Sequence, residues 1–180
     1  VLHSAGIYDV SIQRISGELT DHYDPRTKTL RLSDSTYGSN SIAAVCVAAH
    51  ECGHAIQDKE KYGPLVLRST LVPAANFGSS LSWPIFIAGL VFSIHPLVTA
   101  GIVLFSLAVL FQLVTLPVEF NASSRALRIL ESSHMLGDTE LSGGRKVLKA
   151  AALTYVASLA ASILQLLRLI ILAGGRRRDD

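Results

Sequence analysis

Charge is scarce in this chain. Only 17% of its 180 residues are charged and 49% are hydrophobic, whereas soluble domains carry about a quarter charged residues. A sequence this apolar excludes intrinsic disorder. The formal net charge of +2 is too small for a typical nucleic-acid-binding protein, so we expect no nucleic acid among its partners. The chain therefore either has a large core for its length or lies partly in lipid.

Cysteine and methionine are also rare. The two cysteines, Cys46 and Cys52, fall in one expected helix, roughly 9 Å apart along its axis, which is too far for a disulfide. This spacing excludes a secreted disulfide scaffold. Because the chain begins at Val1 and its one methionine is Met135, we expect a fragment or a processed product of a longer protein.

Residues 1–68 have ordinary polarity and predict a small sheet followed by a helix. Alternation of apolar and polar residues predicts strands at 10–15, 17–23 and 29–33, with a turn at Asp24-Pro25. We expect these strands to form an antiparallel β-meander. The alanine-rich run 42–57, capped by Ser39, Asn40 or Ser41, predicts a helix that is apolar on nearly all sides and therefore buried.

Three long apolar stretches follow, at 71–94, 97–116 and 147–173. Each is long enough to cross a bilayer, and the turn at 93–96 would join the first two as a hairpin. A pair of buried core helices is the alternative, but a chain this small could not cover them. Gly143-Gly144 predicts a break before the third stretch. We expect a mainly α membrane protein with about three transmembrane helices. Its segments are 1–68 (sheet and buried helix), 71–116 (transmembrane hairpin), 117–146 (a helix segment that would carry a third metal ligand), 147–173 (transmembrane helix) and 174–180 (basic tail).

The sequence His50-Glu51-Cys52-Gly53-His54 in the buried helix is an H-E-x-x-H motif. Residues four apart share a helix face, so both histidines can bind one metal ion, which makes the helix zincin-like. Glu51 projects beside the metal, where a carboxylate can take a proton from water. Two imidazoles suit Zn²⁺. The alternative is a pair of core histidines bonded to backbone carbonyls, which would leave Glu51 in need of its own partner. Cys52 faces away and is expected to be a small apolar filler.

A catalytic zinc site needs a third protein ligand. Glu119 is the best candidate, because the hairpin of two spans returns the chain to the side of the membrane that carries the helix of His50 and His54. Glu119 could instead be a plain charge at the lipid boundary. The remaining histidines are less suitable as ligands. We expect His3 and His22 to be exposed, His95 to lie in the hairpin turn on the far side of the membrane, and His134 to be a surface residue in a polar stretch. The other nearby carboxylates are Asp58, Glu60 and Glu131.

Several segments resemble the YugP-type neutral zinc metallopeptidases of bacterial membranes. The resemblance covers essentially the whole chain and is carried by 18–26, 48–57, 72–78 and 116–123. Family members usually begin with one more transmembrane helix. The chain is more distantly similar to HtpX-like and CAAX prenyl proteases, in which a Glu-x-x-Ala-Asp helix carries the third ligand. Glu119 to Ala122 fit that pattern, which implies Glu119 as a ligand. Ser123 stands where those families have aspartate, so Asn121 or Ser123 would have to orient a zinc-binding histidine.

We expect peptide-bond hydrolysis with Zn²⁺ held by His50, His54 and Glu119 and with Glu51 as general base. The oxyanion would be stabilised by Arg125, His134 or a tyrosine such as Tyr23. The strand segment Leu30, Arg31, Leu32 and Ser33 is expected to bind an extended protein or peptide substrate by edge pairing.

Two other functions stay open: an inactive metalloprotease-like scaffold that binds a membrane protein, and a zinc-binding transporter subunit. The absence of charge in mid-span argues against the transporter. Six basic residues flank the spans on the active-site side and three on the far side, which favours a bacterial plasma-membrane protein with a cytoplasmic active site. The basic residues counted are Arg68, Arg125, Arg128, Arg145, Lys146 and Lys149 against Arg176, Arg177 and Arg178.

Overall fold

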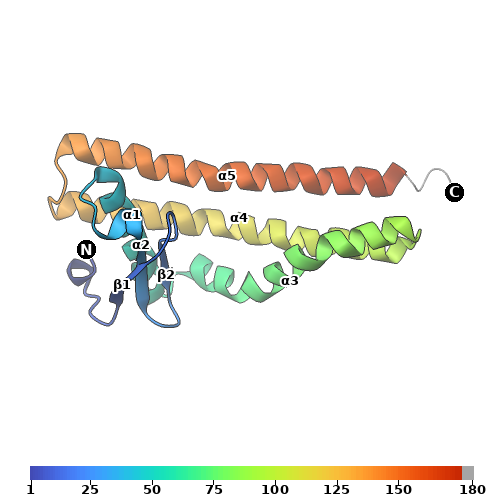
Figure 1. Cartoon of the computed structure of the whole chain (residues 1–180), viewed down its shortest axis with the longest axis horizontal. Coiled ribbons are helices and arrows are strands. Elements are labelled where there is room, and N and C mark those ends of the chain that lie inside the picture. Colours follow the sequence, from blue (N-terminus) through green and yellow to red (C-terminus); the bar gives the residue numbers. More distant parts are fainter. Residues whose placement is uncertain (176–180) are drawn as a thin grey trace. The chain divides into compact units, whose positions relative to one another are not determined.

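The secondary structure is mainly helical, with a small sheet near the N-terminus (Figure 1). The structure is a computed structural model, and it describes residues 1–175. Residues 174 and 175 of the predicted basic tail are the last residues of a helix, and 176–180 lie outside the described residues. The elements in order are a 3-10 helix (His3–Ala5), β1 (Ser11–Ile15), β2 (His22–Asp24), β3 (Thr29–Ser33), α1 (Asp34–Tyr37), α2 (Ile42–Lys59), α3 (Gly63–Val91), α4 (His95–Ser132) and α5 (Asp138–Gly175).

The chain divides into two compact units. Unit 1 consists of Val1–Val66 and Pro117–Leu153 and contains the sheet, α1, α2, the last part of α4 and the first part of α5. Unit 2 consists of Leu67–Leu116 and Thr154–Asp180, which is described up to residue 175. Unit 2 is therefore built from most of α3 and the remaining parts of α4 and α5.

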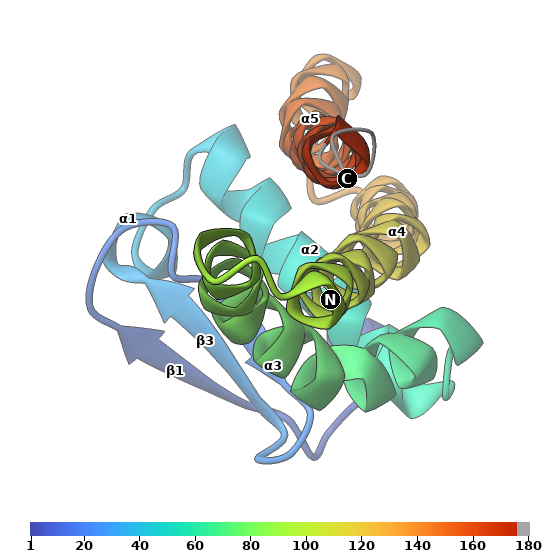
Figure 2. The same cartoon turned by 90° about the vertical axis from the view of Figure 1, so that its right-hand side faces the viewer.

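The sheet is mixed, and the predicted antiparallel meander is wrong. β3 lies in the centre, with β1 parallel to it on one side and β2 antiparallel to it on the other. The arrows of β1 and β3 point the same way in Figure 2. The physical reason is burial: β3 is covered along most of its length, whereas β1 is almost wholly exposed and suits an edge. One part of the predicted meander is present: the turn at Asp24-Pro25 joins β2 and β3, which pair antiparallel.

Helix α2 is the buried centre of unit 1. Its predicted start is confirmed, and among the three candidate caps Ser41 accepts a hydrogen bond from the backbone N–H of Ala44 at 3.2 Å. One side of α2 packs on the sheet and another on α4 and α5. The first cluster includes Leu30, Leu32, Cys52, Ala55 and Ile56, and the second includes Cys46, Ala49, Ala126, Leu130 and Leu148.

The glycine pair before the third apolar stretch lies inside α5, so the predicted break is wrong. A Cβ added at Gly144 would collide with the Sγ atom of Cys46 on α2. The missing side chain thus lets α5 approach α2 closely within unit 1. Close packing against a neighbouring side chain is a second physical reason for glycine besides turn formation, and the local sequence does not distinguish the two.

Glycines also set the helix contacts in unit 2. A Cβ at Gly89 of α3 would lie 2.5 Å from the backbone nitrogen of Val98, and one at Gly101 of α4 would lie 2.7 Å from Cβ of Phe86. Phe86, Val98 and Leu169 form the core cluster of this unit. Small residues at such contacts are typical of helices that pack in lipid.

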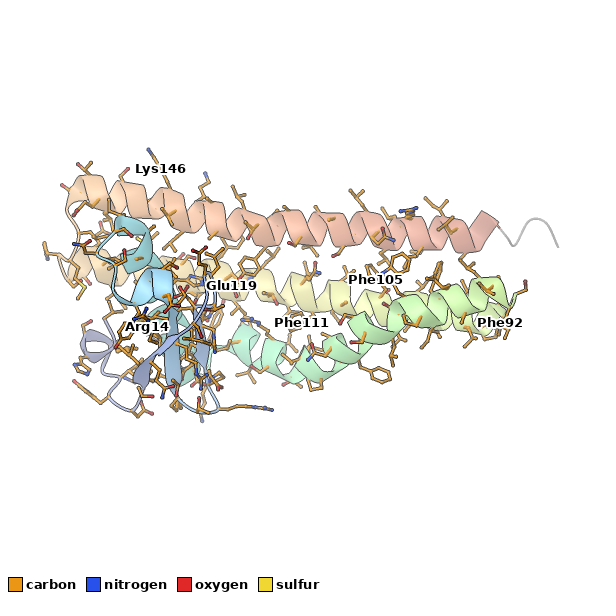
Figure 3. The ribbon with its side chains drawn as sticks, in the orientation of Figure 1. Arg14, Phe92, Phe105, Phe111, Glu119 and Lys146 are labelled. Atoms are coloured by element: carbon orange, nitrogen blue, oxygen red, sulfur yellow. The ribbon has the colours of Figure 1, made fainter. Side chains whose placement is uncertain are left out.

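Among residues 1–175, three helices, α3, α4 and α5, are long and apolar enough to cross a membrane. They correspond to the three apolar stretches predicted from sequence, although each helix extends beyond its stretch. Large apolar side chains on these helices are exposed, for example Val103 of α4 and Leu164 of α5. Phe92, in the turn after α3 and labelled in Figure 3, is 69% exposed.

Candidate metal centre

His50 and His54 lie one turn apart on the same face of α2. Their rings meet edge to face, with centroids 4.8 Å apart. His54 is buried, and the side chain of His50 is only 15% exposed. The i, i+4 spacing in the sequence therefore produces the paired imidazoles that it predicted.

Glu119 joins the two histidines from α4, in the part of that helix that belongs to unit 1 (Figure 3). Its Oε2 atom lies 3.2 Å from Nε2 of His50 and 3.6 Å from Nε2 of His54. The three potential ligand atoms all lie within 4.8 Å of one another. Among the described residues, His50, His54 and Glu119 form the one group of this kind that could hold a metal ion.

The close approach of α2 and α4 depends on the glycine inside the motif. A Cβ added at Gly53 would lie 2.5 Å from the backbone oxygen of Ala122. A real Cβ cannot approach a carbonyl oxygen so closely. Gly53 therefore lets the helix that carries the histidines contact the helix that carries Glu119.

The second nitrogen of each histidine also has a partner. Nδ1 of His50 lies 3.0 Å from Oγ of Ser123, and Nδ1 of His54 lies 3.0 Å from Oε1 of Gln57. Both histidines thus direct Nε2 towards Glu119. Gln57 was not among the site residues predicted from sequence, although its position three residues after His54, on the same helix face, could have indicated it.

Glu51 is 8% exposed and does not belong to the candidate ligand group. Burial raises the pKa of its carboxyl, while the neighbouring His54 and His50 act in the opposite direction. The centre therefore gathers two carboxylates, Glu51 and Glu119, with little contact to solvent.

The donor set fits a zinc ion. Two imidazole nitrogens and one carboxylate oxygen are typical ligands of a catalytic zinc site, which keeps a further position for water or substrate. Partners on the second nitrogen of each imidazole are characteristic of metal-binding histidines. A bound cation would also compensate the cost of burying two carboxylates together.

The structure shows the surroundings of each residue predicted to stabilise the oxyanion. Arg125 donates to Oδ1 of Asn121 at 2.6 Å and pairs with Glu60 at 2.7 Å. His134 lies in the turn after α4, about 20 Å beyond Glu119 along the helix direction. The Tyr23 hydroxyl donates to Asp58 at 2.8 Å, and burial and Asp58 raise its pKa.

The other histidines also lie apart from the group. His3 stacks on Tyr8, and His95 is exposed at the start of α4. His22 is half-buried rather than exposed, because its ring nitrogens contact the Thr20 carbonyl oxygen and Arg31.

The predicted substrate strand is not an edge. Leu30, Arg31, Leu32 and Ser33 belong to β3, which pairs with β1 and β2 on its two sides. Just before β2 begins, Oδ1 of Asp21 accepts a hydrogen bond from the backbone N–H of Ser33 at 2.8 Å. The strand has no free edge because β1 pairs with β3 and not with β2, which places the most buried strand in the centre.

A match to the family described as "Putative neutral zinc metallopeptidase" covers residues 1–174. The chain is 48% identical over 172 residues to a protein of Bacillus subtilis (strain 168) named "Putative membrane protease YugP", and the aligned region covers 96% of this chain and 76% of that relative. No solved structure matches the chain. The family predicted from sequence is confirmed: the chain belongs to the "Putative neutral zinc metallopeptidase" family.

Proposed function

We propose that this chain is a zinc-dependent metalloendopeptidase that hydrolyses peptide bonds in protein or peptide substrates. The observation that carries the proposal is the buried group of His50, His54 and Glu119. The family description and the name of the Bacillus relative support the same class of reaction.

His50, His54 and Glu119 would hold the zinc ion, each through one atom. When bound, zinc supplies a Lewis acid that polarises a carbonyl group and activates water at neutral pH. Glu51 follows His50 directly and lies beside the ligand group without belonging to it. Its carboxylate would take a proton from the attacking water and deliver it to the leaving amine as the peptide C–N bond breaks.

We further propose that the apolar stretches of α3, α4 and α5 cross the bacterial plasma membrane. Only 11% of the most apolar 18-residue stretch of α4 is buried within the protein, and the same share holds for α5. An apolar surface of this size would be unfavourable in water, whereas lipid would cover it. The excess of basic residues on the active-site side supports a cytoplasmic active site.

Two variants test the metal centre and the general base separately. Glu51→Gln keeps the size of the side chain but removes the carboxylate, so we expect zinc binding to persist while peptide cleavage falls by at least about 100-fold. Glu119→Ala removes a ligand, so the purified protein should lose bound zinc. Metal analysis and cleavage of a fluorescent casein in detergent, with and without a chelator, measure both effects.

Three results would contradict the proposal. Cleavage by Glu51→Gln at the wild-type rate would remove Glu51 as the base. Full zinc occupancy in Glu119→Ala would remove Glu119 as a ligand. Zinc-loaded wild type that cleaves no substrate in a broad peptide library would favour the inactive scaffold.

A further inference from the structure

Gln57 makes three hydrogen bonds beneath the metal centre and is fully buried. Its Oε1 atom lies 3.0 Å from Nδ1 of His54, and its Nε2 atom donates to the Val118 carbonyl oxygen at 2.8 Å and to Oδ1 of Asn121 at 3.0 Å. We propose that Gln57 is a positioning residue, which keeps His54 in the tautomer that leaves Nε2 free to bind the metal. This inference rests on the proposed zinc site.

The orientation of the Gln57 amide follows from its partners. A backbone carbonyl oxygen can only accept hydrogen bonds, so the group facing Val118 must be the NH₂ group. The opposite orientation would place the amide oxygen against the oxygens of Val118 and Asn121. The Oε1 atom of Gln57 therefore faces His54.

The orientation of the Asn121 side-chain amide also follows from its partners. Nε of Arg125 lies 2.6 Å from Oδ1 of Asn121, and arginine only donates. Oδ1 of Asn121 thus accepts from both Arg125 and Gln57. Arg125 is itself held by Glu60 at 2.7 Å, and its guanidinium lies 5.8 Å from the centroid of the Tyr62 ring.

These hydrogen-bond directions determine which ring nitrogen of neutral His54 carries the proton. Because Oε1 of Gln57 is an acceptor, Nδ1 of His54 must carry the proton and Nε2 must carry the lone pair. That lone pair is on the nitrogen that faces Glu119. His50 differs, because its Nδ1 partner is the hydroxyl of Ser123, which can donate or accept.

The same hydrogen bonds join the two helices that carry the ligands. Gln57 lies on α2, and its two acceptors, Val118 and Asn121, lie on α4 on either side of Glu119 in sequence. Gln57 therefore orients His54 and also holds the segment of Glu119 against α2. Residues that orient metal ligands in this way typically contribute 10–100-fold to metal affinity.

The test compares zinc affinities of full-length variants in detergent, measured by competition with a chelating dye. Gln57→Leu keeps the bulk but removes all three hydrogen bonds, and we expect zinc to bind about 10–100-fold more weakly. Asn121→Asp keeps an acceptor for Gln57 and Arg125 and should bind zinc within about threefold of wild type. Asn121→Leu removes that acceptor and should bind zinc more weakly than Asn121→Asp. Cys46→Ala, at another buried α2 position, is the matched control.

A second readout separates positioning from general damage to the fold. The cobalt-loaded protein reports ligand geometry through its visible absorption bands. We expect these bands to change in Gln57→Leu but not in Cys46→Ala. If Gln57→Leu does not accumulate, the pair Asn121→Asp and Asn121→Leu carries the test.

Wild-type zinc affinity and an unchanged cobalt spectrum in Gln57→Leu would overturn the inference. If Gln57→Leu is not produced, equal affinities of Asn121→Asp and Asn121→Leu would overturn it. His54→Ala distinguishes this failure from failure of the proposed function. If His54→Ala weakens zinc binding while Gln57→Leu does not, the metal centre stands without the positioning role. If wild type binds no zinc, both proposals fail.

Discussion

At the scale of single residues, the partners of the two histidines differ. His54 contacts an amide whose direction is determined by its neighbours, whereas Nδ1 of His50 contacts Oγ of Ser123 at 3.0 Å. A serine hydroxyl is a weaker partner for imidazole than a carboxylate would be. A substitution at Ser123 should therefore change the strength of the hydrogen bond to His50, and with it the basicity of the His50 imidazole.

Ser123→Ala removes the hydrogen-bond partner of His50, and we predict up to about 10–100-fold weaker zinc binding. Ser123→Asp restores a strong acceptor and should bind zinc at least as tightly as wild type. The measurement is the zinc dissociation constant of each purified variant.

The neighbouring hydroxyl provides the control. Ser124 is exposed and bonds the Phe120 carbonyl oxygen of its own helix, so Ser124→Ala should leave zinc affinity unchanged. Equal affinity of wild type and Ser123→Ala would show that the hydroxyl does not support His50.

At the scale of elements, the site depends on how closely α2 and α4 approach. The helices touch where Gly53 of α2 meets the backbone of Ala122 of α4. Gly53 directly precedes His54, and Ala122 comes three residues after Glu119. A backbone oxygen cannot move aside as a flexible side chain can. An added methyl group must therefore separate the helices at the candidate metal centre.

Gly53→Ala should destabilise the protein by about 1–3 kcal/mol through overpacking and should weaken zinc binding as well. Gly63→Ala is the matched control, because a Cβ at Gly63 meets no atom within 4 Å. Thermal unfolding and zinc titration of the two variants provide the comparison. Gly53→Ala with the stability and zinc affinity of Gly63→Ala would contradict the role of this contact.

At the scale of the whole molecule, the membrane hypothesis makes a prediction about sidedness. If α3 and α4 form a transmembrane hairpin, the turn between them lies across the membrane from the sheet. His95 begins α4 after that turn, and Arg26 is exposed in the turn between β2 and β3.

Single cysteines in a background without Cys46 and Cys52 test this arrangement. A membrane-impermeant maleimide should label His95→Cys on intact spheroplasts, and should label Arg26→Cys only after permeabilisation. Labelling of both sites before permeabilisation would contradict the hairpin. The reversed pattern would keep the hairpin but contradict the cytoplasmic active site.

The pairing of the two histidines could be predicted because it depends on local spacing. The period of a single helix arranges His50, Glu51 and His54. The length and composition of the three apolar stretches are enough to identify them as possible membrane spans. The family was likewise recognisable from short motifs. These features need no knowledge of which segments meet in space.

Contacts between distant segments could not be predicted in the same way. The crossover that places β3 in the centre of the sheet, the approach of α5 to α2 at Gly144 and the link from Gln57 to Asn121 each join residues that lie far apart in sequence. A local sequence pattern cannot predict such pairings, because they depend on how the packed elements bury one another's surfaces. The sequence indicated Glu119 as a metal ligand, but only the packing of α4 on α2 brings its carboxylate to 3.2 Å from His50.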